Sequence, residues 1–185
     1  KNVRSRLMGI PTLITTLTAS SSASLADTSS MTSTYDEYMF VFTDIHPSAG
    51  AHFTFQVNAD GQSGYNETMT TTFVRSVHKE DDSSSGLSYT AGYDQAQGTA
   101  YHQLCEYVGN DADESLAGIL HIFNPASTTY VKHFYARTQH QNYFPASDDT
   151  LTAGYINTTA AITDISFKMA SGNIDAGVIQ IYGIS

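Results

Sequence analysis

The chain has 185 residues, with 18 acidic and 8 basic side chains and a formal net charge of −10. Only 14% of the residues are charged, well below the roughly 25% of an average soluble domain, whereas aromatic residues make up 11%. This composition excludes coiled-coil, collagen-like and disordered chains, and no apolar run reaches the roughly 18 residues of a membrane-spanning helix.

The charge is unevenly distributed along the chain. Lys1, Arg4 and Arg6 precede the first acidic residue, so the remaining body is strongly acidic. An acidic body repels phosphate backbones, and we therefore expect no nucleic-acid partner. Residues 1–28 also contain a short apolar stretch and an Ala/Ser-rich segment, as a secretory signal does, but Pro11 and several threonines interrupt the apolar stretch. We expect a retained N-terminal arm or edge strand over residues 1–34.

Strand signals recur at short intervals from Tyr35 to the end of the chain. Residues 51–58 alternate cleanly, with Phe53, Phe55 and Val57 on one face and polar side chains on the other. Turn-forming residues separate the segments, as in 60–64, 109–111 and 145–148. The predicted strands are residues 37–45, 51–58, 68–78, 87–91, 101–108, 115–123, 129–138, 151–157, 162–169 and 176–182.

Short strands without helices between them are typical of antiparallel sandwiches and barrels. The spacing predicts an all-β fold: an antiparallel, jelly-roll-like β-sandwich over residues 35–185, preceded by an extended N-terminal arm. The order of the strands does not follow from this pattern.

One predicted strand, residues 37–45, is apolar on both faces. In a two-layer antiparallel sandwich one face of each sheet meets water, so a second apolar face needs a cover. The N-terminal arm or a neighbouring subunit would supply it. We therefore expect a homo-oligomer, and the interface candidates are Tyr38, Phe40 and Phe42 on one face and Met39, Val41 and Ile45 on the other.

The motifs of hydrolytic catalysis are incomplete in this sequence. The string 61–65 around Ser63 lacks the final glycine of a nucleophile elbow and lies between strands, which is typical of a turn serine. Cys105 lies in a predicted strand and is expected to be a buried, inert thiol. The sequence thus predicts no enzyme, no catalytic residue and no cofactor.

Metal-binding patterns are equally weak. His102, His121 and His133 lie on three predicted strands and would form a metal trio if they converged, but isolated structural histidines are the favoured interpretation. Asp111 and Asp113 lie in an acidic turn that lacks the spacing of an EF-hand loop. We favour a solvated loop there, and calcium binding near these residues stays open.

Tyrosines in predicted loops provide a further candidate surface. Tyr65, Tyr93 and Tyr143 are residues that stack on sugar rings or fill protein interfaces.

Several stretches resemble a group of small virion proteins of tailed phages, especially marine and cyanobacterial ones. The resemblance covers about Ser33 to Ile184 and is carried by residues 33–47, 53–56, 123–133 and 165–184, the last with a strand, Ser-Gly-Asn, and a strand ending in Tyr-Gly-Ile. It implies a jelly-roll-like sandwich and a role in virion assembly or surface display. It also implies that the expected homo-oligomer is a trimer.

The resemblance and the composition together predict a non-enzymatic structural protein on the outer surface of the virion. It would form part of a tail fibre, an appendage or the capsid decoration, and its N-terminal arm would contact other virion proteins. Two alternatives stay open: a carbohydrate-binding module that recognises a host-surface glycan, and a β-sandwich polysaccharide hydrolase.

Overall fold

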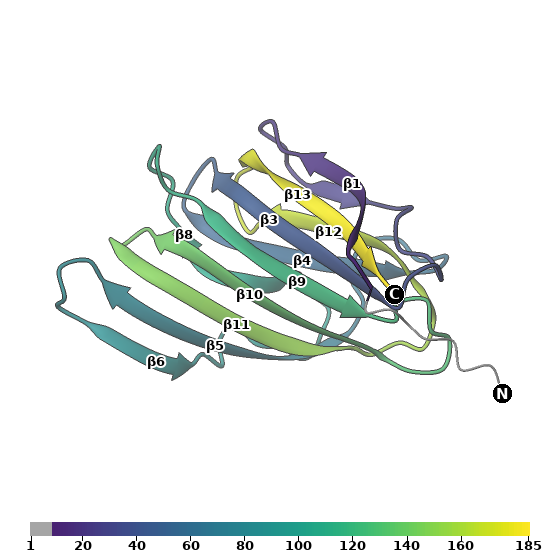
Figure 1. Ribbon diagram of the computed structural model, residues 1–185. Coiled ribbons are helices and arrows are strands. Elements are labelled where there is room, and N and C mark those ends of the chain that lie inside the picture. Colours follow the sequence, from purple (N-terminus) through teal and green to yellow (C-terminus); the bar gives the residue numbers. More distant parts are fainter. Residues whose placement is uncertain (1–8) are drawn as a thin grey trace.

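The computed structural model describes residues 9–185 and shows an all-β, antiparallel fold without a helix in that part of the chain (Figure 1). The all-β prediction is confirmed. Among these residues there is accordingly no helix long and apolar enough to cross a membrane. The strands are β1 (Thr12–Thr18), β2 (Leu25–Asp27), β3 (Glu37–Pro47), β4 (Ala51–Ala59), β5 (Met69–Lys79), β6 (Ser85–Tyr89), β7 (Ala96–Gly98), β8 (His102–Val108), β9 (Leu116–Phe123), β10 (Lys132–Asn142), β11 (Ala146–Ile156), β12 (Ile162–Met169) and β13 (Ile174–Ile184).

Hydrogen-bonded pairing runs through β1, β13, β3, β9 and β10 and then divides. On one side β10 pairs with β11, which continues to β5 and its neighbours β6 and β7. On the other side the pair Asn142–Val108 joins β10 to β8, which continues to β4, β12 and β2. Since β1 and β2 also contact each other, the sheet curls into a nearly closed, barrel-like shape (Figure 1).

Aromatic side chains fill the interior between β3 and the strands opposite it. Phe42 lies 5.2 Å from Phe53 of β4, and Phe40 lies 5.7 Å from Phe167 of β12, measured between ring centroids. All four rings are fully buried. Burying each such side chain contributes about 1.5 to 3 kcal/mol to folding, so this cluster is a main source of stability.

The prediction that Ile45 shares a face with Met39 and Val41 is wrong. Ile45 is fully buried on the interior side, together with Phe40 and Phe42. The reason is a register shift between Phe42 and Ile45, where Asp44 adopts a left-handed backbone with φ of 53°. An extra residue at such a bulge reverses the alternation of side chains beyond it.

The segment preceding β3 adds strands to the sheet instead of extending away from it. β1 pairs with β13, and β2 pairs with β12, at the two ends of the strand path. The Tyr38 hydroxyl donates to the Thr32 carbonyl oxygen (2.9 Å) and accepts from the Thr32 N–H (2.8 Å), which ties this segment to β3. Residues 9–34 therefore provide edge strands, and the basic residues Lys1, Arg4 and Arg6 lie outside the described residues.

Candidate functional site

The six predicted interface residues lie on opposite sides of β3. Tyr38, Phe40, Phe42 and Ile45 are at most 1% exposed and belong to the interior of this chain. Met39 and Val41 are half-buried and point to the other side of the sheet, which we call the outer face. Of the six, these two are therefore the residues that a partner can reach.

Strand register extends this apolar character far beyond β3. Val41 lies opposite Ile119 of β9, which in turn lies opposite Arg137 of β10. Beyond Arg137 the same row continues with Leu151 of β11 and Val74 of β5. Leu151 is 50% exposed, whereas Ile119 and Val74 are half-buried. The outer face thus carries a row of aliphatic side chains across four strands, interrupted by one arginine.

A neighbouring row on the outer face is aromatic. Met39 lies opposite His121, which lies opposite Tyr135 of β10. The His121 ring stacks on Tyr135, with centroids 4.7 Å apart and planes 19° apart, and Phe123 lies nearly parallel to it on β9. The Nδ1 atom of His121 contacts the Glu37 carboxylate, which fixes the imidazole in this stack.

At one end of the outer face Phe123 and Tyr135 border a hollow of about 520 Å³, which we call the aromatic groove. It runs across β9, β10, β11 and β5, and its described lining residues include no aspartate, glutamate, lysine or arginine. The lining residues that matter below are Thr70, Thr72, Phe123, His133, Tyr135 and Tyr155.

An ordered set of polar groups lies at the rim of the aromatic groove. The Gln97 amide donates to the Thr70 hydroxyl (Nε2–Oγ1 2.6 Å) and to the Tyr155 hydroxyl (3.3 Å). The Asn157 amide in turn donates to Gln97 Oε1 (2.7 Å). Gln97 has a φ of 55°, a left-handed conformation that is costly for a side chain of this kind. The rim is therefore held in a defined geometry.

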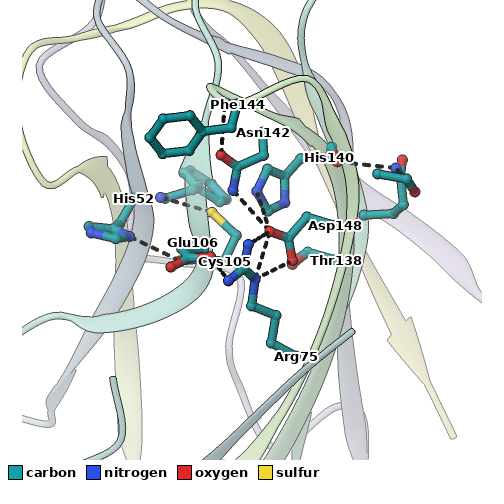
Figure 2. Close-up of polar contacts among 12 residues, drawn as sticks. His52, Arg75, Cys105, Glu106, Thr138, His140, Asn142, Phe144 and Asp148 are labelled. Carbon is teal, nitrogen blue, oxygen red and sulfur yellow. Dashed lines mark hydrogen bonds and ion pairs between the residues drawn. The ribbon is translucent and has the colours of Figure 1, made fainter. Parts of the chain in front are cut away.

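A separate cluster of polar side chains lies between β5, β8, β10 and β11 (Figure 2). Arg75 of β5 contacts the fully buried carboxylate of Asp148 on β11 and also pairs with Glu106 of β8 (2.5 Å). The Asn142 amide donates to Asp148 Oδ2 (2.9 Å), the oxygen that Arg75 also contacts. His140 Nε2 lies 3.9 Å from that oxygen. The cluster thus ties four strands together through one buried carboxylate.

The surroundings of this cluster set its protonation. For Arg75 burial acts to lower the pKa, but the hydrogen bonds and charge of Asp148, with Glu106, outweigh it and the pKa is raised. Burial lowers the pKa of His140 to about 4, although Asp148 acts in the opposite direction. Burial also raises the pKa of the Cys105 thiol, whose Sγ accepts a hydrogen bond from the Phe53 N–H (3.2 Å).

Cys105, His140 and Asp148 are residue types of thiol catalysis and lie in one cluster (Figure 2). A nucleophilic cysteine needs a thiolate, and this thiol is fully buried with a raised pKa. Cys105 therefore agrees with the expectation of a buried, inert thiol. The polar cluster is best explained as a structural link between the four strands.

The three histidines considered as a metal trio do not converge. His102 lies in the interior, where its Nε2 contacts the Thr152 hydroxyl at 2.6 Å and burial lowers its pKa to about 4. His121 and His133 lie on the outer face. Within residues 9–185 there is no group of three metal-ligating side chains.

At the acidic turn, the Asp111 N–H donates to the Glu114 carboxylate (2.7 Å), so that carboxylate closes the turn itself.

The loop tyrosines lie outside the aromatic groove. The Tyr93 hydroxyl donates to Glu106 (3.2 Å), Tyr65 lies beside Tyr101, and Tyr143 is 59% exposed next to Phe144. Sequence reasoning missed the groove residues because they come from different strands. The alternation of His133, Tyr135, Arg137 and Gln139 was the available signal.

Comparison of the chain with protein-family models, with curated proteins and with solved structures finds no match. The resemblance to phage virion proteins therefore stays a prediction that rests on the quoted residues.

Proposed function

We propose that the chain is a non-enzymatic structural protein of a tailed-phage virion, which forms a symmetric homo-oligomer on the outer surface of the particle. The resemblance favours a trimer. The resemblance over residues 33–184 supports the virion role. The all-β body with a polar network buried inside it suits a repeated structural part. Within the particle the chain would belong to a fibre, an appendage or the capsid decoration.

The observation that carries the oligomer is the aliphatic row on the outer face. Val41 lies beside Ile119, and Leu151 lies beside Val74, with Arg137 between the two pairs. All four aliphatic side chains are only partly covered. Exposed apolar patches bordered by polar side chains are typical of interaction sites. In residues 9–34 the chain adds strands at the sheet edges, so the described part of the expected arm is not laid over this face. We propose that a second copy of the chain covers this outer face.

Within the all-β fold, the arrangement of strands also supports a jelly-roll-like sandwich. Strands β4 and β12 face β3 and β10 across the aromatic interior, as the ring contacts of Phe53, Phe55 and Phe167 indicate. The basic residues at the N-terminus would then contact other virion proteins.

A matched pair of variants on β3 tests the interface. Val41→Asp places a charge on the outer face, and we expect it to produce a folded monomer. Phe40→Asp places a charge in the interior beside Phe167 and is expected to unfold the chain, because a buried unpaired charge is strongly destabilising. If Val41→Asp leaves the oligomer intact, this face is not the interface.

Mass spectrometry of purified particles tests the virion role, which requires the chain to be a stoichiometric component.

A further inference from the structure

We propose that the aromatic groove binds a neutral oligosaccharide. The groove lies across β9, β10, β11 and β5 at one end of the outer face, and its volume of about 520 Å³ falls within the usual range of small-ligand sites. Its walls are contributed by regular strands, so the positions of its side chains are fixed by the sheet.

The lining of the groove matches the two surfaces of a sugar. Phe123, Tyr135 and Tyr155 provide aromatic area on which the C–H faces of a pyranose ring can pack. His133 and the hydroxyls of Thr70 and Thr72 lie along the same walls, so hydrogen-bonding groups are close to the rings. This combination of apolar walls and a few placed polar groups is typical of ligand sites.

The charge of the groove defines the class of sugar. The chain carries a formal charge of −10, and neighbouring hollows on the same face are lined by charged residues, Arg137 and Asp149 in one and Lys79 and Glu80 in another. The lining residues of the aromatic groove include no aspartate, glutamate, lysine or arginine. A charged sugar would lose hydration there without gaining an ion pair, so the ligand that fits is neutral.

The rim provides the orientation that a hydroxyl-rich ligand needs. Gln97 fixes the Tyr155 and Thr70 hydroxyls and is itself fixed by Asn157. The left-handed backbone of Gln97 is a local strain of the kind that is concentrated at functional sites. Since these groups are already ordered, a ligand would lose little entropy in aligning them.

The test uses the full chain and a panel of hexasaccharides: cellohexaose, maltohexaose and mannohexaose as neutral probes and hexagalacturonate as the acidic probe. We expect saturable calorimetric binding of at least one neutral probe and none of hexagalacturonate. Tyr155→Ala is expected to weaken that binding at least about tenfold, and Tyr155→Phe, which retains the ring, to weaken it less. Tyr143→Ala, which removes an exposed tyrosine outside the groove, should leave the affinity unchanged.

Three results would overturn the proposal. The first is that no neutral probe binds, and the second is that hexagalacturonate binds as well as the best neutral probe. The third is that Tyr155→Ala changes the mass of the oligomer, because the groove would then be a contact between copies of the chain. The inference does not depend on the virion role, and measuring the oligomer mass in the same samples separates failure of sugar binding from failure of assembly.

Discussion

The guanidinium of Arg75 holds the fully buried carboxylate of Asp148, with Nε 2.8 Å and Nη2 2.6 Å from Oδ2. This pair joins β5 to β11, and Glu106 extends it to β8. A buried carboxylate is strongly destabilising when its charged partner is removed. The packing of these strands around Asp148 therefore depends on Arg75.

Replacing Arg75 by Met is therefore expected to destabilise the fold by about 3 kcal/mol. This value is at the low end for a broken buried pair, because the Arg75 side chain is 23% exposed and water can partly replace it. Urea unfolding measures the loss. The matched control is Arg137→Met, which removes an arginine 68% exposed from its pair with Asp149 and should change stability little. Equal losses in the two variants would contradict a special role for the buried pair.

Two buried histidines should make the fold sensitive to acid. Burial lowers the pKa of both His102 and His140 to about 4, from the ordinary histidine value of 6.5. Between these values the unfolded chain binds protons that the folded chain does not, so stability falls as the pH falls from about 6.5 toward 4.

Between pH 7 and pH 5 each of these histidines should lower the free energy of unfolding by about 2 kcal/mol. The measurement is urea unfolding at both pH values for the native chain and for His140→Gln, in which the loss should be about 2 kcal/mol smaller. A variant with the same pH dependence as the native chain would show that His140 does not take part.

Cys105 should be protected from alkylation in the folded protein. Its side chain is fully buried and burial raises its pKa, so both access and thiolate are lacking. Iodoacetamide is expected to modify it only under unfolding conditions, as followed by intact mass. Rapid modification of the native chain would indicate that the interior near β8 opens readily.

Gly177 should be irreplaceable at the bulge opposite Asp44. Its φ is 112°, and a Cβ atom at this position would lie 2.4 Å from the Asp44 carbonyl oxygen. Gly177→Ala is expected to cost about 1 to 3 kcal/mol from backbone strain, with a further loss from the contact. The control is Gly86→Ala on the edge strand β6, where a Cβ atom meets nothing within 4 Å. Similar melting temperatures for the two variants would argue against the strained bulge.

Local patterns predicted most strands of this fold, and long-range pairing explains what they missed. The alternation of residues 51–58 identified β4 almost to its ends. By contrast, residues 145–148 were predicted as a turn, whereas β11 begins at Ala146 and the buried Asp148 points to Arg75. Polar residues that are buried with a partner in a distant strand have the same local signature as turn residues.

The candidate sites show the same limit. A single strand is sufficient to show that residues 37–45 are apolar on both sides, but not that Met39 and Val41 are the two on the outer face. The aromatic groove needs the register of four strands, which brings Phe123, Tyr135 and Tyr155 together from three of them. Short and bulged strands do not reveal that register in a single sequence, and the reversal at Asp44 shows how one residue changes it.

The most direct test of the central claim, that the outer face joins copies of this chain, is the mass of the native protein in solution. Multi-angle light scattering at micromolar concentration should give a single species of three times the 20.0 kDa chain mass. In the same experiment Val41→Asp should give a folded species at the mass of one chain. A native protein that scatters as a single species near 20.0 kDa would contradict the assembly and with it the proposed structural role of this face.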